Sequence, residues 1–331
     1  MNIPHRPRRL RRSATLRDLV AEHRVHADQL VMPHFCLNKE SAREAIDSMP
    51  GIERLGRKEL VEQVRADLAL GIRSVLLFGL ADSGEKDPTG TKCNDASGAV
   101  PLAVSALKAE FGADIVVMTD VCLCAYTDHG HCGVIENGEV KNDPSLALLA
   151  GMALAHAEAG ADVVSPSDMM DGRVDAIREL LDDNGYENIA IMAYSAKYAS
   201  AYYGPFRDAA DSAPSDSADV PKDRKTYQMD SRNRWEARRE AGLDEAEGAD
   251  ILMVKPGLAY LDIIAEVDHM TDLPVAVYNV SGEYSMVKAA AERGWIDEAD
   301  VVRENLHAFV RAGANIIITY HAREALQGGW L

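Results

Sequence analysis

Residues 251–257 spell Ile-Leu-Met-Val-Lys-Pro-Gly, an apolar run of strand length that ends in a lysine and a turn. After it, residues 260–267 repeat apolar side chains with helical spacing, and residues 275–280 form a second apolar run. A strand, a helix and a second strand in this order predict a right-handed crossover between parallel strands. The lysine is unusual there, because burying an ammonium ion is costly.

The same unit recurs along the whole chain. Strand-like runs are predicted at residues 30–35, 74–80, 115–121, 161–165, 189–195, 251–255, 275–280 and 315–320. Helical patterns lie between several of them, at residues 60–70, 146–158, 174–181, 260–267 and 301–312, and glycine often follows, as at Gly71, Gly160 and Gly313. Eight units over roughly 300 residues predict a closed (β/α)8 TIM barrel rather than an open doubly wound sheet. No glycine-rich dinucleotide motif follows an early strand, which weakens the open-sheet alternative.

Two segments fall outside the repeating unit. Residues 1–28 are expected to form an N-terminal arm before a barrel domain at 29–331, and they carry a cluster of arginines, namely Arg6, Arg8, Arg9, Arg11 and Arg12. We expect this arm to pack on a neighbouring subunit or to stay mobile; an organelle-targeting peptide is the alternative. Residues 198–232 include a long irregular stretch rich in Ser, Asp, Pro and Gly, and are expected to form an active-site lid.

The composition excludes several classes of protein. With 53 acidic against 35 basic residues among 331, the formal charge of -18 disfavours nucleic acid and anionic membranes as partners. No apolar run approaches the roughly 20 residues of a membrane span. Five cysteines, an odd number in a chain too long to need disulfides, are typical of a reducing cytoplasm. Two of them, Cys36 and Cys93, lack ligand-like neighbours and are expected to be buried thiols.

The other three cysteines follow the third predicted strand, in residues 120–132, Asp-Val-Cys-Leu-Cys-Ala-Tyr-Thr-Asp-His-Gly-His-Cys. Thiolates of Cys122, Cys124 and Cys132 favour zinc, and three protein ligands leave a fourth position for water or substrate, as in a catalytic site. His129 and His131 lie in the same loop and could instead complete a closed structural site. Ordinary thiols are the third possibility.

Two lysines are candidate nucleophiles. Lys255 ends the strand quoted above, and Lys197 lies two residues beyond the strand predicted at 189–195. Burial lowers the pKa of a lysine, and two ammonium ions on neighbouring strands lower it further, which favours the neutral amine that forms Schiff bases. The pair is therefore predicted to be catalytic, and a salt-bridged structural role is the alternative.

Further polar residues end strands at the same rim of the barrel, where a TIM barrel carries its active site. They are Asp120, Ser167, Asp168, Ser281 and Tyr320. Hydroxyl groups of Ser281 and Tyr320 can donate to a substrate carboxylate, and Arg207 and Arg224 in the lid offer charged donors. Taken singly, each is also compatible with a surface residue or a helix cap.

Five motifs together resemble those of the porphobilinogen synthase family, also called delta-aminolevulinic acid dehydratase. They are residues 120–133, 192–200, 203–209, 253–257 and 278–282. The resemblance runs from about residue 8 to the C-terminus, with the cysteine loop and both lysine motifs in the family's order and spacing. It implies a barrel with an N-terminal arm, a homo-octamer, and the condensation of two 5-aminolevulinate molecules to porphobilinogen with loss of two waters.

The resemblance also implies roles for single residues. Lys255 and Lys197 would bind the first and the second substrate as Schiff bases, Asp120 would orient a zinc ligand or the substrate amine, and Cys122, Cys124 and Cys132 would hold zinc. The first substrate's carboxylate would meet Ser281 and Tyr320, the second's would meet Arg207, Arg224 and Gln228, and Glu240 would bind an allosteric magnesium.

The chain departs from the family at Thr226, where some members carry a zinc-linked cysteine, so a second zinc at His131 is not expected. The stretch 211–223 is also longer and more acidic than the family pattern.

Two other functions use part of the same pattern. A Schiff-base aldolase on the same barrel needs one strand-end lysine but has no use for three cysteines nearby. A non-catalytic zinc scaffold would keep the cysteine loop and salt-bridge the lysines. Trapping with borohydride separates the scaffold from the enzymes, because a scaffold forms no covalent adduct.

Overall fold

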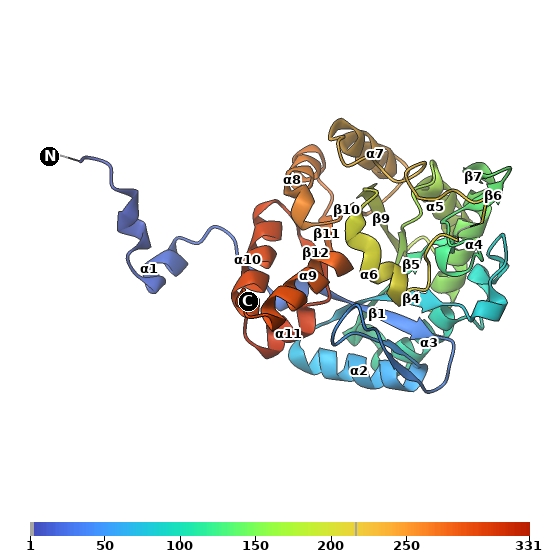
Figure 1. Ribbon diagram of the computed structural model, residues 1–331, viewed down its shortest axis with the longest axis horizontal. Helices are drawn as coiled ribbons and strands as arrows, with labels where there is room; N and C mark the ends of the chain where they lie inside the picture. The colour runs from blue at the N-terminus through green and yellow to red at the C-terminus, as the bar shows by residue number, and fades with distance from the viewer. Residues whose placement is uncertain (1–2, 216) are drawn as a thin grey trace.

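The computed structural model describes residues 3–215 and 217–331 (Figure 1). Over these ranges, parallel strands pair in chain order around a barrel, and the last strand pairs with the first, so that the sheet closes. The barrel strands are β1 (Leu30–Leu37), β4 (Ser74–Leu80), β5 (Val116–Val121), β8 (Val163–Pro166), β9 (Ala190–Lys197), β10 (Ile251–Lys255), β11 (Val275–Asn279) and β12 (Ile316–Thr319). The predicted (β/α)8 TIM barrel is confirmed.

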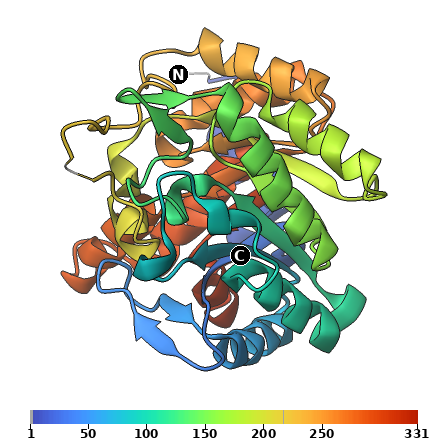
Figure 2. The same cartoon turned by 90° about the vertical axis from the view of Figure 1, so that its right-hand side faces the viewer.

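Helices pack around the outside of these strands (Figures 1 and 2). They are α2 (Arg57–Leu70), α3 (Ala99–Phe111), α4 (Asp143–Glu158), α5 (Arg173–Asp183), α7 (Trp235–Ala246), α8 (Leu261–Met270), α9 (Ser281–Glu292), α10 (Glu298–Arg311) and α11 (Ala322–Gln327). Short 3-10 helices connect them, at η2 (Ala27–Gln29), η3 (Ser83–Glu85), η4 (Thr91–Asn94), η5 (Gly112–Asp114), η6 (Leu123–Ala125) and η8 (Leu258–Tyr260). No helix in the described ranges is both long and apolar enough to cross a membrane.

Two small hairpins extend the barrel. In the first, β2 (Arg43–Ala45) pairs antiparallel with β3 (Glu53–Leu55), and β3 in turn pairs with β1. The second, β6 (Val134–Glu136) with β7 (Glu139–Lys141), forms a separate sheet directly after the cysteine loop.

The predicted strand ends are correct to within two residues, but two of the differences move site residues. Lys197 is the last residue of β9 and does not lie two residues beyond the strand, whereas Tyr320 follows β12 and is not part of it. Among the described helices around the barrel, α3, α7, α9 and α11 have no counterpart in the helical patterns named from the sequence.

Helix α2 shows how the repeating pattern builds the core. Leu60, Val64 and Asp67 recur at helical spacing and point inward, and Leu60 and Val64 are 1% and 0% exposed. Burying an aliphatic side chain of this size stabilises the fold by roughly 1.5–3 kcal/mol. Gly71 ends the helix at φ 100°, a left-handed conformation that favours glycine.

The N-terminal arm extends away from the barrel (Figure 1). It contains η1 (Pro7–Arg11) and α1 (Ala14–Leu19), neither of which has a buried residue. Residues 1–2 of the predicted arm lie outside the described residues. The boundaries at residues 28 and 29 stay a prediction.

The predicted lid, residues 198–232, begins with η7 (Ala201–Tyr203) and α6 (Gly204–Ala209) and continues without helix or strand in its described part. Residue 216 lies outside the described residues. Both ends of the lid are tied to the barrel, because Tyr198 N donates to the carbonyl of Lys255 and Met229 N donates to the carbonyl of Lys197.

Candidate active site

Two lysines lie side by side where β9 and β10 end. The parallel register pairs Lys197 with Lys255, and the two residues are 5% and 4% exposed. A register shift opposite Leu252 and Val254 gives β9 one more residue than β10 over this stretch. Such a bulge re-aims side chains, and here Tyr194, three residues before Lys197, shares its face of the strand.

Aromatic rings surround the amine of Lys255. Its Nζ lies 4.1 Å from the ring centroid of Tyr278, 5.0 Å from those of Tyr194 and Phe206, and 5.4 Å from that of Tyr203. Burial lowers the pKa of Lys255 to about 7, and the nearby charge of Lys197 acts in the same direction. A large fraction of this side chain is therefore the neutral, nucleophilic amine at neutral pH.

Lys197 has a polar partner instead. Its Nζ donates a hydrogen bond to the backbone carbonyl of Ser167, just beyond β8, and lies 5.4 Å from the ring of Tyr194. The next residue, Asp168, is buried, and burial raises its pKa to about 7 although the Arg173 guanidinium opposes this. A carbonyl acceptor stabilises an ammonium ion, so this amine is held in place more firmly than that of Lys255.

Asp120 lies near the end of β5, within electrostatic reach of both amines. Burial raises the pKa of its carboxyl, and the charges of Lys197 and Lys255 and a hydrogen bond from Ser167 act against that shift. A carboxyl with a raised pKa close to two amines can exchange protons with them.

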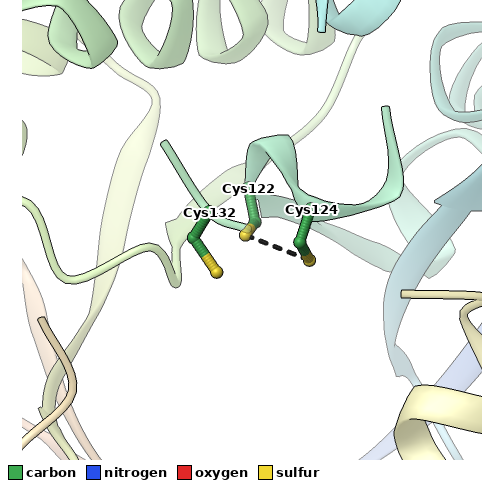
Figure 3. Close-up of side chains that lie close together, drawn as sticks. All are labelled: Cys122, Cys124 and Cys132. Carbon is green, nitrogen blue, oxygen red and sulfur yellow. Dashed lines mark hydrogen bonds between the residues drawn. The ribbon is translucent and has the colours of Figure 1, made fainter. Parts of the chain in front are cut away.

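The three predicted ligands of zinc come together in the loop after β5. The Sγ atoms of Cys122, Cys124 and Cys132 point into one space (Figure 3) and lie within 4.8 Å of one another. Cys122 Sγ donates a hydrogen bond to Cys124 Sγ at 3.3 Å, and all three residues are buried. Three convergent thiols are a donor set that fits zinc.

The two histidines of the loop are engaged elsewhere. His131 Nδ1 lies 3.0 Å from the Tyr227 hydroxyl and its Nε2 2.7 Å from the carbonyl of Pro221, while His129 Nε2 lies 3.1 Å from the carbonyl of Pro88. Within the described chain, the group of potential ligands at this point contains the three cysteines alone. This arrangement favours an open fourth position over a closed structural site.

A positive charge complements the thiols. Hydrogen bonds from Cys122 and Cys124 hold the pKa of the Cys132 thiol well below its ordinary value. Burial acts to lower the pKa of Arg224, but the charges of Cys132 and Cys124 outweigh it and raise that pKa above its usual range. Hydrogen bonds to its two neighbours raise the pKa of Cys122, and the hydrogen bond to Cys132 together with burial outweighs the one from Cys122 and raises the pKa of Cys124. Cys132 is therefore the thiol that most favours the thiolate, the form that binds metal.

The lid lies directly against the cysteine loop. Arg224 Nη2 donates to the carbonyls of Gly130 at 2.8 Å and Ser212 at 2.7 Å. Gly130 has φ +73°, and a Cβ there would lie only 2.4 Å from the carbonyl oxygen of Ala213. Glycine therefore allows the lid to approach the loop this closely.

The candidate carboxylate-binding residues form two groups. Ser281 Oγ accepts a hydrogen bond from the backbone N–H of Phe206 at 2.9 Å, and the Tyr320 hydroxyl lies 2.9 Å from that of Tyr278. Both contacts involve residues that surround Lys255, so this group borders the first lysine. Whether these side chains bind substrate stays a prediction.

The second group belongs to the lid. Arg207 is half-buried and borders an open cavity of about 560 Å³, and burial together with the charge of Arg224 lowers its pKa. Gln228 is 3% exposed, and in the described ranges neither its amide oxygen nor its nitrogen has a hydrogen-bond partner. Buried polar atoms of this kind are costly unless a ligand satisfies them.

Glu240 lies away from the cysteines, on α7. It borders a cavity of about 290 Å³ that Asp171, Glu236 and Gln228 also line. Burial raises the pKa of its carboxyl, although the charge of Arg173 opposes this. Within the described chain Glu240 belongs to no group of three close metal ligands, so its magnesium site stays a prediction.

No role for the rings around Lys255 is predicted from the sequence. Tyr194 has an odd separation from Lys197 on one strand, which places the two on opposite faces unless the strand bulges. Tyr203 and Phe206 come from the start of the lid, and Tyr278 comes from β11. The repeated aromatic residues at strand ends and at the start of the lid were the available signal.

Comparisons with known proteins agree along almost the whole chain. The family model of delta-aminolevulinic acid dehydratase matches residues 4–328. The chain is 52% identical to the delta-aminolevulinic acid dehydratase of Synechococcus elongatus, covering 99% of this chain and 98% of that one. It is 49% identical to the Bacillus subtilis enzyme of the same name, with 99% and 98% covered. It also superposes with a TM-score of 0.95, at 46% identity, on the crystal structure of the Toxoplasma gondii enzyme in complex with its reaction product porphobilinogen, covering 98% of this chain and 92% of that one.

Proposed function

The chain belongs to the delta-aminolevulinic acid dehydratase family of hydro-lyases, and from this premise we propose that it joins two 5-aminolevulinate molecules through Schiff bases on Lys255 and Lys197. These matches confirm the family that the sequence motifs predict. The observation that carries the proposal is the pair of buried amines in register on β9 and β10, beside three convergent thiols. Two such anchors can hold both ketones of a condensation at the same time.

Lys255 acts first because burial leaves a large fraction of its amine neutral. The amine attacks the ketone carbon of one substrate, a carbon–nitrogen bond forms, and the carbonyl oxygen leaves as water. The rings of Tyr278, Tyr194 and Phe206 exclude solvent from this imine. The same chemistry on Lys197 anchors the second ketone and releases the second water.

The held substrates then react with each other. After each imine carbon has bonded to an atom of the other substrate, its bond to the lysine breaks, the carbon gains a double bond in the ring, and a proton from the substrate passes to the departing amine. The two waters lost are those released when the imines formed, so they carry the two ketone oxygens. Two imines held on adjacent strand ends convert a bimolecular condensation into a reaction between positioned neighbours. Asp120, which faces both amines, is placed to accept and return protons and to orient a substrate amine.

Cys122, Cys124 and Cys132 would hold zinc, and the convergence of their sulfurs fits that ion. When bound, zinc supplies a Lewis acid that polarises an oxygen or nitrogen ligand in the open position. Arg224 adds a fixed positive charge beside the same loop.

The two carboxylate groups of the substrates would bind at opposite sides of the lysine pair. Ser281 and Tyr320 border Lys255, whereas Arg207, Arg224 and Gln228 approach from the lid. The second substrate would thus bind beneath the lid, which already lies against the cysteine loop and would enclose it.

Three further features of the proposal concern regulation, assembly and cellular compartment. A hydrated magnesium ion at Glu240 would activate the enzyme from the cavity that Gln228 also borders. The exposed arm would pack on neighbouring subunits of a homo-octamer, which sedimentation of a chain lacking residues 1–24 would test. The five cysteines are free and buried, in keeping with a reducing cytoplasm.

Incubation of the purified chain with 5-aminolevulinate, followed by colour detection of a pyrrole, tests the function directly. We expect pyrrole formation that a strong chelator abolishes and added zinc restores. A borohydride adduct without pyrrole would favour an aldolase instead, and the absence of both would favour a non-catalytic scaffold.

A further inference from the structure

A second group of potential metal ligands lies outside the barrel, behind the end of β12. Glu298 begins α10, His321 directly precedes α11, and Glu324 lies on α11. One ligand atom from each lies within 4.8 Å of the other two. Helices α9, α10 and α11 meet at this point on the side of the barrel near the C-terminus (Figure 1). The group is separate from the cysteine loop.

The histidine of this group is buried without a polar partner. His321 is 2% exposed, and neither ring nitrogen forms a hydrogen bond with any described residue. Its Nδ1 lies 3.6 Å from Glu324 Oε2, beyond hydrogen-bond distance, and that oxygen is also unpartnered in the described chain. A ring nitrogen and a carboxylate oxygen that face each other without bonding are destabilising unless something bridges them.

The charges of the group are not balanced. Lys288, on α9, places its Nζ 2.7 Å from Glu298 Oε1 and 2.5 Å from Glu324 Oε1. Its single positive charge meets two carboxylates. His321, buried beside these carboxylates, offers a ring nitrogen as a further metal ligand.

We propose that Glu298, His321 and Glu324 form a second binding site for a divalent transition-metal ion, of which zinc is the example tested below. Lys288 competes with this ion for the two carboxylates. A donor set of one imidazole and two carboxylates suits zinc and its neighbours better than magnesium, which prefers oxygen ligands alone. The Lys288 side chain is 16% exposed, and its flexible stem lets the ammonium move to solvent when the ion enters.

The site would act on the barrel through one peptide link. His321 follows Tyr320, whose hydroxyl contacts that of Tyr278 inside the barrel. An ion bound to His321 would fix the turn after β12 and brace Tyr320 from behind. The ion would thus be structural and distinct from a zinc held by cysteines.

Zinc binding can be measured in a background that lacks the cysteine site. The Cys132→Ala chain is stripped with chelator, dialysed and titrated with zinc sulfate in a calorimeter, with bound metal checked by elemental analysis. We expect one zinc ion per chain, which is lost when His321→Phe is added. Phenylalanine keeps the ring that packs 4.5 Å from the Tyr284 ring, and circular dichroism checks that the variant is folded.

Lys288→Met separates a metal site from a plain ion-pair network. Removing the competing ammonium should tighten zinc binding about tenfold, equivalent to 1.4 kcal/mol. Lys92→Met, which removes an exposed lysine paired with Asp95, serves as the matched control and should leave the affinity unchanged. Zinc binding that survives His321→Phe, or that Lys288→Met weakens, would overturn the proposal.

Discussion

Lys255 and Lys197 are paired in register, yet their surroundings differ. Four aromatic rings face Lys255 Nζ, whereas Lys197 Nζ is hydrogen-bonded to the carbonyl of Ser167. Burial in an aromatic environment lowers the pKa of Lys255 to about 7. Two lysines at neighbouring strand ends therefore have different surroundings on one rim, with one amine enclosed by rings and the other held by a hydrogen bond.

Removing the reactive amine should have the largest effect. We expect Lys255→Met to lower turnover on the order of 10⁴-fold or more, because a nucleophile acts as a unit with its partners. Covalent trapping of 5-aminolevulinate by borohydride should disappear as well, as mass spectrometry of the chain would show. Full activity in this variant would contradict the assignment, and Lys58→Met, which removes an exposed lysine, is the control.

Removing the held amine should separate binding from condensation. Lys197→Met should also abolish pyrrole formation, but the first substrate should still form a borohydride adduct on Lys255. Loss of the like charge should raise the pKa of Lys255 above its present value of about 7. In the parent chain, trapping should rise with pH through about 7, because the protonated amine below that pH is not nucleophilic, and the variant's profile should move to higher pH. An unchanged profile would mean that the two amines are not coupled.

Removing one thiol should weaken catalysis without removing either amine. We expect Cys124→Ala to lose the zinc of the loop and about 10²–10³-fold in turnover, the range typical of losing one electrostatic stabiliser. The adduct on Lys255 should persist, because the substitution leaves that amine and the rings that surround it in place. Cys93→Ala, which removes a buried thiol that lies against the carbonyl of Leu148, should keep both metal and activity. If Cys124→Ala kept its activity in chelator, the zinc would have no catalytic role.

The sequence predicted those features of the site that depend on neighbours in the chain. Strand-length apolar runs end where polar residues begin, so the order of residues along the chain was enough to predict the rim of the barrel and the two lysines on it. The three cysteines fall within one loop, and their convergence needed no knowledge of the fold. Among the helices, α9 was missed because its first turn buries Ser281, Gly282 and Glu283 in place of apolar side chains.

The surroundings of the lysines could not be predicted in this way. The bulge in β9 brings Tyr194 to the face of Lys197 against the strand's two-residue period. The rings of Tyr203 and Phe206 reach Lys255 only because η7 and α6 pack over the rim, where Phe206 N donates to Ser281 Oγ. The period of apolar residues and the spacing of motifs in the sequence predict local geometry. The contrast between the two amines, however, arises from contacts between segments that are far apart in the chain.

The smallest effect we predict comes from a variant that separates the aromatic ring of Tyr278 from its hydroxyl group. It tests which of the two acts on the amine of Lys255. Tyr278→Phe keeps the ring 4.1 Å from Lys255 Nζ but removes the hydrogen bond to Tyr320. A net hydrogen bond is worth about 1 kcal/mol, so KM for 5-aminolevulinate should rise roughly fivefold as Tyr320 loses its support, with kcat little changed. The pH midpoint of trapping should stay near 7, because burial by the ring sets it and the ring remains. A shifted midpoint with an unchanged KM would assign the phenol hydroxyl to the amine and leave Tyr320 without a role in holding the substrate.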